Sequence, residues 1–255
     1  MTDQPVSGLF TPFTVSERFL ENPRTVSLVC KEALPSAQPG QYAMVWLPGL
    51  GEKPFSIANN GPLMLTVSAV GKISQAIFNL QVGERLWARG PLGQGYQTQG
   101  KRHVLVGGGY GAAPLVFLAR RLRERGDEVS VCLGARSRED LLLVSSFEPL
   151  HCQVALTTED GSIGLKGLVS LPAEACLKEG ADTLYACGPI GMLIAVADLA
   201  RKYHANAQLS FEGMIRCAIG LCGSCELPEA VCQQVGLPAG WLVCHDGPVA
   251  VLNYA

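Results

Sequence analysis

The chain has 255 residues, of which 48% are hydrophobic and 16% are charged, and its formal net charge at pH 7 is −2. Globular domains average about 25% charged residues, so the composition leaves two interpretations open: a surface partly covered by a partner, or a large buried core. The absence of a basic run argues against nucleic acid as a partner. The most apolar stretch, residues 103–119, is broken by glycines and by Pro114, which argues against a membrane span.

The first hundred residues have the pattern of β structure. Short apolar or alternating runs, separated at regular spacing by Gly, Pro and Asn, are typical of an antiparallel barrel or sandwich. These runs are TVSLVCKEA, GQYAMVWLPG, KPFSIAN, LMLTVSAVG and RLWARGPLG. One helix is expected among them, at SQAIFNLQ, with Ser74 as its N-cap.

Two stretches of this β segment carry groups that could meet a phosphate. Lys53 and Ser56 lie in KPFSIAN, and Gly71, Lys72 and Ser74 open the short helix. Backbone N–H groups at a helix start and a lysine charge together favour a pyrophosphate. Taken alone, a solvated lysine and a capping serine explain the same residues.

From about residue 101, strands and helices alternate. HVLVGGG and EVSVCLGAR are predicted strands, and APLVFLARRLRERG is a predicted helix that ends at Gly126. CQVALTTEDG, TLYACGP and GMLIAVADLARKYH repeat the alternation, which predicts an α/β domain with a mainly parallel sheet. After about residue 206 the regular pattern fades. We therefore expect three domains, at residues 1–100, 101–205 and 206–255.

The turn VGGGYGAAP follows a predicted strand and precedes a helix. Its pattern matches G-x-G-x-x-A, which brings backbone N–H groups toward a pyrophosphate, and its glycines are Gly107, Gly108, Gly109 and Gly111. A tight turn that requires small residues is the alternative. The acidic residue expected at the end of the second strand is missing, and Arg136 and Arg138 stand there instead, so NAD and NADP both stay open.

A second turn, YACGP, ends another apolar strand. It contains Cys187, Gly188 and Pro189, and a turn at the carboxyl edge of a parallel sheet faces the ligand crevice. Cys187 either fills space in the core or lies beside a nicotinamide ring.

The segment CAIGLCGSC places Cys217, Cys222 and Cys225 at the spacing C-x4-C-x2-C, which is typical of plant-type [2Fe–2S] sites. Gly220 and Gly223 allow the backbone to approach a cluster closely. The fourth ligand is either Cys232, in an expected loop, or Cys244, in the strand-like run WLVCHDGPV. We favour Cys244 because a strand fixes a ligand more firmly.

Structural zinc and buried free thiols are the alternatives to a cluster, although zinc sites usually combine paired C-x2-C units. The chain holds ten cysteines, and its first residues do not resemble a signal peptide. We therefore expect a reducing cytoplasm, where clustered cysteines are metal ligands or catalytic thiols rather than a disulfide framework.

Read in order, these motifs resemble the ferredoxin–NADP reductase superfamily and, within it, the family of electron-transfer subunits of NAD-dependent dihydroorotate dehydrogenase. The resemblance covers essentially the whole chain and rests on KPFS, VGKIS, GPLGQGY, VGGGYGAAP, TEDGSIGLKG, YACGP, CAIGLCGSC and CHDGPV. It implies an FAD-binding β-barrel, an NAD-binding α/β domain and a small [2Fe–2S] domain.

The resemblance also implies roles for single residues. The flavin and its phosphates would be contacted by Lys53, Pro54, Phe55 and Ser56, and the FAD pyrophosphate would be held by Gly71, Lys72 and Ser74. The NAD would meet Gly107 to Gly111, with Cys187, Gly188 and Pro189 near the nicotinamide, and the cluster ligands would be Cys217, Cys222, Cys225 and Cys244. Lys53 and Phe55 replace an Arg and a Tyr that are common in the superfamily; Lys keeps the charge and loses the planar fork.

The family implies that electrons pass from the FMN of a dihydroorotate-oxidising catalytic subunit through the [2Fe–2S] cluster and FAD to NAD+. The expected assembly is a heterotetramer of two catalytic and two electron-transfer subunits. Alternatives with the same architecture are subunits of a cytosolic hydrogenase, a sulfide dehydrogenase or a ferredoxin:NADP transhydrogenase. An alternative of another class is a zinc-stabilised, non-redox adaptor that senses a nucleotide.

Overall fold

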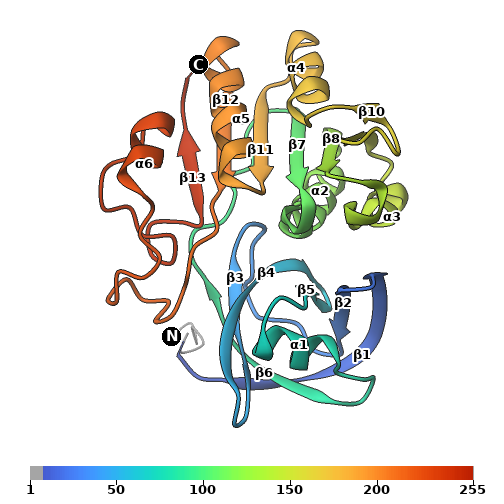
Figure 1. Ribbon diagram of the computed structural model, residues 1–255, viewed down its shortest axis with the longest axis vertical. Coiled ribbons are helices and arrows are strands. Elements are labelled where there is room, and N and C mark those ends of the chain that lie inside the picture. The colour runs from blue at the N-terminus through green and yellow to red at the C-terminus, as the bar shows by residue number, and fades with distance from the viewer. Residues whose placement is uncertain (1–7, 255) are drawn as a thin grey trace.

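The computed structural model describes residues 8–254 and divides them into a β-barrel and an α/β body (Figure 1). The first seven residues of the expected segment 1–100, and Ala255 of the segment 206–255, lie outside the described residues. None of the helices in residues 8–254 has the length and apolar character that a membrane crossing requires.

Six antiparallel strands close the barrel in the order β1-β2-β5-β4-β3-β6. Their bounds are β1 Thr11–Asn22, β2 Thr25–Cys30, β3 Tyr42–Leu47, β4 Gly51–Asn60, β5 Leu63–Ser68 and β6 Arg85–Leu92. Side chains that alternate toward the inside, such as Ala43, Val45 and Leu47 of β3, form the barrel core. The expected antiparallel barrel is confirmed.

The helix α1 (Lys72–Phe78) lies between β5 and β6, where a helix was expected, but its N-cap prediction was wrong. Gly71 is the N-cap, and Ser74 lies three residues further along. The Ser74 hydroxyl accepts hydrogen bonds from the N–H groups of Val70 and Gly71 at 3.1 and 3.0 Å. Ser74 therefore closes the turn from inside the helix.

The second body is a seven-stranded sheet in the order β10-β9-β8-β7-β11-β12-β13, parallel except for β13. Its strands are β7 Arg102–Gly108, β8 Glu128–Ala135, β9 Gln153–Thr158, β10 Leu165–Lys166, β11 Thr183–Cys187, β12 Asn206–Ser210 and β13 Val249–Leu252. The expected parallel-rich sheet is confirmed. The strand order reverses between β7 and β11, and ligands bind beyond the carboxyl ends of strands at such a point.

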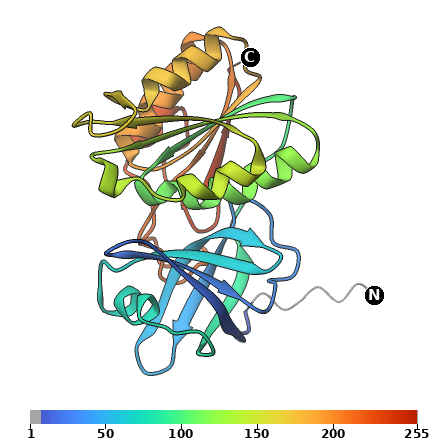
Figure 2. The same ribbon diagram turned by 90° about the vertical axis from the view of Figure 1, so that its right-hand side faces the viewer.

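Helices cover both faces of this sheet (Figure 2). They are α2 Ala112–Glu124, α3 Val144–Phe147, α4 Ser170–Lys178 and α5 Ile190–Lys202. One core cluster joins the sheet to α2 and α3, and another joins it to α4 and α5. Helix α2 also packs on β4 of the barrel and places Phe117 in the barrel core. The two bodies therefore share a packed interface.

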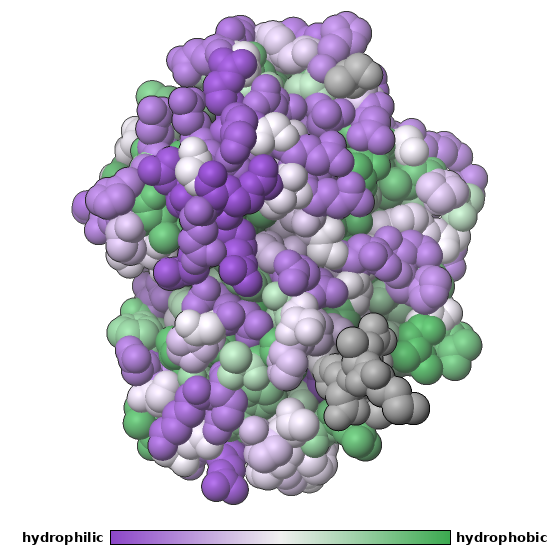
Figure 3. Space-filling view, turned by 180° about the vertical axis from the view of Figure 1, so that it is seen from behind, coloured by the Kyte–Doolittle hydropathy of each residue, from purple (hydrophilic) through white to green (hydrophobic). Residues whose placement is uncertain are grey.

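The cysteine-rich residues run from the end of β12 to β13 and include the helix α6 (Glu229–Val235). Strands β12 and β13 both belong to the large sheet. The cysteine-rich residues between these two strands lie outside the sheet. The division at residues 100 and 205 stays a prediction. Seen from behind, the surface of the α/β body is largely polar (Figure 3).

Candidate functional site

Two cavities lie where the barrel meets the carboxyl edge of the sheet. The first, which we name the central cavity, has a volume of about 600 Å³ and is lined by residues of β4, β5, β11 and the segment after β12. The second, the sheet-edge cavity, has about 620 Å³ and is lined from β8, β9 and the turns after β7 and β11. Tyr110 lines both cavities, together with Ser68 and Val70 of the barrel, so the two cavities meet along these three residues.

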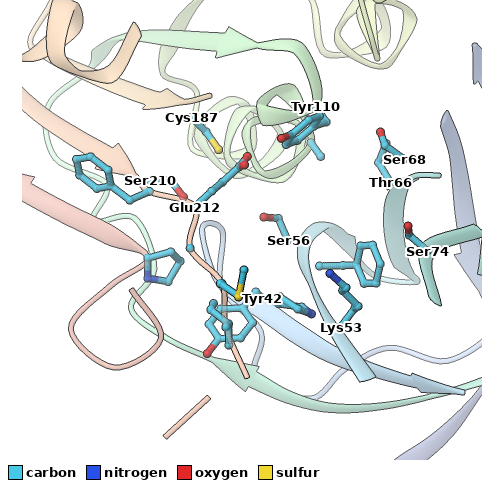
Figure 4. Close-up of a pocket in the computed structure, with 18 of the residues that line it drawn as sticks. Tyr42, Lys53, Ser56, Thr66, Ser68, Ser74, Tyr110, Cys187, Ser210 and Glu212 are labelled. Carbon is cyan, nitrogen blue, oxygen red and sulfur yellow. The ribbon is translucent and has the colours of Figure 1, made fainter. Parts of the chain in front are cut away.

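The stretch KPFS lies on β4 and lines the central cavity with all four residues, Lys53, Pro54, Phe55 and Ser56. Figure 4 shows the Ser56 hydroxyl near the middle of the cavity and Lys53 at its lower side. Thr66 and Ser68 of β5 add two hydroxyl groups that the sequence analysis did not single out.

The expected phosphate-binding turn at α1 is only partly in the central cavity. Ser74 lines the cavity, whereas Gly71 and Lys72 are exposed residues outside its lining. The Ser74 hydroxyl also donates to the Gly71 carbonyl at 3.0 Å, so its hydrogen-bonding capacity serves the turn. The N–H groups of Val70 and Gly71 are likewise engaged by Ser74.

The two glycine turns meet at the point where the strand order reverses. Gly107 pairs with Cys187 across β7 and β11. A methyl group added at Gly111 would clash with the carbonyl group of Cys187, and one added at Gly188 would lie 3.1 Å from Gly108. Small residues are therefore required here by close packing of backbone on backbone.

The predicted nucleotide residues divide between the two cavities. Gly108, Gly109 and Pro189 line the sheet-edge cavity, and Cys187 lines the central cavity. Gly107, Gly111 and Gly188 lie behind them as packing residues. Burial raises the pKa of the Cys187 thiol to about 12, so this group stays protonated and uncharged.

Sequence reasoning missed Glu212, which follows β12 and lines the central cavity. Its carboxyl group points toward Tyr110 and Cys187 (Figure 4). Removal from water raises the pKa of Glu212, and the Glu212 charge raises the pKa of Tyr110. A signal was available, since FEG directly follows a buried strand of the sheet and its side chains meet the same edge.

In the sheet-edge cavity, carboxylates accompany the predicted arginine. Arg136 lines the cavity and pairs with Asp140 at 3.4 Å, while Arg138 is outside the lining. Asp140 also pairs with Arg24 of the barrel, which ties the two bodies together. Glu159, directly after β9, lines the cavity as well and was not predicted. Both signs of charge therefore face this cavity.

The four favoured cysteines lie in one neighbourhood. Burial, followed by the neighbouring Cys225 and Cys217, raises the pKa of the Cys244 thiol, and the Cys222 sulfur lies 3.0 Å from the Ser224 hydroxyl. The Cys244 N–H donates to the Cys225 sulfur at 3.4 Å, and the Gly220 N–H donates to the Cys244 sulfur at 3.3 Å. Backbone N–H groups, first that of Ile219, lower the pKa of Cys217 to about 6.

The environment of Cys232 differs from that of Cys244, and neither lies in the element expected. Cys232 is buried in α6, and its thiol faces the Leu227 carbonyl at 3.9 Å. Cys244 lies in a turn rather than a strand, since the Asp246 carboxylate accepts from the Leu242 N–H at 2.7 Å and bends the chain. Among residues 8–254, no three or more His, Cys, Asp and Glu side chains gather around a point where a single metal ion could sit.

The barrel holds the cysteine segment by two polar contacts. The Tyr42 hydroxyl donates to the Cys244 carbonyl at 3.2 Å, and an Arg89 N–H donates to the Cys217 carbonyl at 3.3 Å. Tyr42 and Met44 of β3 face away from the barrel core and join the core cluster that contains Cys225 and Cys244. Tyr42 also lines the central cavity, so it touches both places.

No protein-family profile matches the chain. Curated relatives described as probable dihydroorotate dehydrogenase B (NAD(+)), electron transfer subunit, match most of it. The relative from Thermococcus kodakarensis is 41% identical over 213 residues, which is 83% of each chain. The relative from Methanopyrus kandleri is 38% identical over 242 residues, which is 93% of this chain and 88% of the relative.

Solved structures share the arrangement of barrel and sheet. A chain from the structure of an NADH-dependent reduced ferredoxin–NADP oxidoreductase gives a TM-score of 0.79 at 25% identity, covering 96% of this chain and 89% of that chain. The FAD/NAD-binding domain of a nitric oxide dioxygenase from Vibrio cholerae gives 0.67 at 21% identity, covering 76% of this chain and 93% of that chain. The fold is therefore that of ferredoxin-reductase-type flavoproteins.

Proposed function

Because this chain belongs to the family of electron transfer subunits of NAD-dependent dihydroorotate dehydrogenase, we propose that it binds FAD, NAD(H) and a [2Fe–2S] cluster and carries electrons from a catalytic partner to NAD+. The observation that carries this proposal is the connection of three places. Tyr110 joins the sheet-edge cavity to the central cavity, and Tyr42 joins the central cavity to Cys244.

The central cavity suits the flavin of FAD. Phe55 and Pro54 offer apolar surface for a ring system, Ser56 offers a hydroxyl in the middle of the cavity, and Lys53 offers a positive charge. In this role Lys53 would neutralise phosphate charge. Ser74 would act mainly by fixing the turn at Gly71, since its hydroxyl is already bonded there.

The sheet-edge cavity suits a dinucleotide whose nicotinamide reaches the central cavity past Tyr110. Gly108 and Gly109 allow close approach to its pyrophosphate, and Cys187 and Glu212 lie where the nicotinamide would arrive. Two arginines of this cavity, Arg24 and Arg136, share the single Asp140 carboxylate, and Glu159 adds a second negative charge. We propose NAD as the dinucleotide because the chain belongs to an NAD-dependent family.

The four cysteines suit a [2Fe–2S] cluster better than zinc. Four thiolates bind the two irons of such a cluster, whereas one zinc ion needs its four ligands around a single point. The spacing C-x4-C-x2-C followed by a distant fourth cysteine fits the first arrangement. The N–H groups of Gly220 and Cys244, which point at sulfur, would stabilise its negative charge.

A bound flavin supplies the exchange between the two electrons of a hydride and the single electrons of an iron–sulfur cluster. The chain supplies position and surroundings. The glycine turns would bring the nicotinamide to the central cavity, the Cys187 thiol there stays protonated, and Tyr42 on β3 lies between the cavity and Cys244. Electron transfer between the proposed flavin and the proposed cluster requires a short distance between them.

We further propose that the catalytic partner docks over the cysteine loop. Met214, Ile219 and Leu221 are 64%, 56% and 82% exposed, and Cys222, next to Leu221, is exposed as well. An FMN-containing dihydroorotate dehydrogenase subunit, in an assembly of two plus two chains in the reducing cytoplasm, would cover these side chains and receive the shortest path to the cluster.

The variant Cys222→Ser tests the route. It should keep FAD and the reduction of a dye by NADH, because both cavities are unchanged, and it should lose electron transfer from the copurified catalytic subunit. Cys176→Ser, which alters a partly exposed thiol on α4, is the matched control and should keep both activities. Transfer that survives in Cys222→Ser would overturn the proposed route.

A further inference from the structure

Arg89, on a strand of the barrel, places a positive charge next to the cysteine segment. It lies on β6, its side chain is only 11% exposed, and its guanidinium donates to the Cys217 carbonyl at 3.3 Å. The same guanidinium lies 5.5 Å from the centre of the Phe10 ring. Burial of the guanidinium keeps its field from being screened by water.

Glu52 is the partner of this charge. Its two carboxylate oxygens accept from Arg89 at 3.2 and 3.3 Å, which is the bidentate geometry that arginine favours. Glu52 on β4 and Arg89 on β6 reach each other across β3, the strand that separates the barrel core from the cysteines. Glu52 also lines the central cavity. The ion pair therefore stands between the two proposed redox sites.

We propose that the Arg89–Glu52 ion pair sets the reduction potential of the cluster held by Cys217, Cys222, Cys225 and Cys244. This inference rests on the proposed function, because it requires that cluster. Arg89 favours the reduced form and Glu52 opposes it, since each electron taken up adds negative charge to the cluster.

The arrangement supports an electrostatic role beyond anchoring. An anchor needs a donor to the Cys217 carbonyl, which a neutral side chain can provide. Arg89 instead brings a full charge to the backbone of a proposed ligand, and Glu52 holds that charge in place while lowering its effect. Net charge near a cluster is one of the factors that set its potential.

The test substitutes each partner of the ion pair in turn. The two substitutions should shift the reduction potential of the cluster in opposite directions. The full chain is purified anaerobically with its cofactors, its iron and sulfide are counted, and it is titrated with dithionite in the presence of redox mediators. EPR of the reduced cluster measures the fraction reduced. At a fixed potential, Arg89→Gln should lower the ratio of reduced to oxidised cluster about tenfold, which is about 59 mV for one electron. Glu52→Gln should raise the same ratio.

Two further variants separate charge from structure. Arg89→Lys keeps the charge and should restore most of the wild-type ratio. Arg18→Gln is the matched control: Arg18 donates to the Phe78 carbonyl at 3.2 Å and lies over an aromatic ring, away from the cysteines, and its loss should leave the ratio unchanged.

Shifts of the same sign in Arg89→Gln and Glu52→Gln, or no shift in either, would overturn the inference. If Arg89→Gln loses its iron, Glu52→Gln still decides the matter, because it leaves the donor to Cys217 in place. A wild-type chain with no iron and no EPR signal would instead overturn the proposed function itself, so the two failures are distinguishable.

Discussion

The hydroxyl of Tyr42 donates a hydrogen bond of 3.2 Å to the carbonyl oxygen of Cys244, which is 202 residues further along the chain. Burial, followed by the charges of Cys244 and Cys225, raises the pKa of Tyr42, so the phenol stays protonated and remains a donor. The contact joins the outer face of the barrel to the turn that carries the proposed fourth cluster ligand. It makes the barrel wall part of the site.

We expect Tyr42→Phe to lower the free energy of unfolding by about 1–2 kcal/mol, because a buried carbonyl loses its donor. It should also speed the loss of the cluster to a chelator, followed by visible absorbance. Tyr96→Phe is the matched control, since the Tyr96 hydroxyl donates to the Ala186 carbonyl at 3.3 Å in an equally buried place. It should lose similar stability without faster cluster loss; equal rates of loss in both variants would contradict this account.

Serine substitutions should separate Cys244 from Cys232. Cys244→Ser should give a chain that retains FAD and lacks the cluster, because its sulfur interacts with Cys225 and receives the Gly220 N–H. Cys232→Ser, inside α6, should retain the iron and sulfide of the wild type. The measurement is the iron and sulfide content per flavin, and a loss of iron in Cys232→Ser alone would reverse the assignment.

Leu221→Asp should weaken binding of the catalytic subunit at least tenfold, because a charge would replace an apolar side chain that is 82% exposed beside the cysteines. Val82→Asp is the control, since Val82 is 60% exposed on the barrel between α1 and β6. Copurification and analytical ultracentrifugation measure the binding. Unchanged assembly in Leu221→Asp, with FAD and iron present, would place the partner elsewhere.

Stability should fall with acid because of a buried pair at the other edge of the sheet. Asp127 accepts a hydrogen bond from Lys101 at 2.8 Å and forms an ion pair with Arg125 at 3.1 Å, and His103 lies at 3.3 Å. Burial raises the pKa of Asp127, but its cationic partners outweigh burial and hold that pKa below its usual range. For His103, burial lowers the pKa despite the neighbouring carboxylate.

Both pKa values are lowered in the folded chain, so both groups make the protein less stable as the pH falls. Below about pH 6.5 the unfolded chain binds a proton at His103 that the native chain does not, so the free energy of unfolding falls by up to about 1.4 kcal/mol per pH unit. The contribution of Asp127 is present above about pH 4 and is lost as the pH falls further. Urea unfolding between pH 4 and 8 measures the slope. His103→Gln should flatten it between pH 5 and 6.5, and the exposed His151→Gln should not.

The sequence predicted the barrel, the sheet and two glycine turns that face a ligand, because each follows from local patterns and from the rule that ligands gather at the carboxyl edge. Glu212 and Glu159 were missed because each is a single acidic residue in a loop, and its role depends on strands that are distant in sequence. The position just after a strand places both residues at the carboxyl edge, but only the sheet order shows which cavity each one lines.

The errors at the cysteines and at α1 have local causes. WLV reads as a strand, but the Asp246 side chain caps the Leu242 N–H and turns the chain at Cys244. The helix around Cys232 has readable ends, with Pro228 before it and Gly236 in the left-handed conformation after it. Ser74 acts from the third helical position rather than the N-cap.

An anaerobic visible spectrum of the purified chain, recorded before and after addition of NADH, tests the central claim most directly. We expect flavin bands with a broad iron–sulfur shoulder at longer wavelength, and we expect NADH to bleach both. Flavin bands without the shoulder, in a chain whose cysteines hold zinc by metal analysis, would contradict the cluster. A colourless chain that does not respond to NADH would contradict the electron-transfer function as a whole.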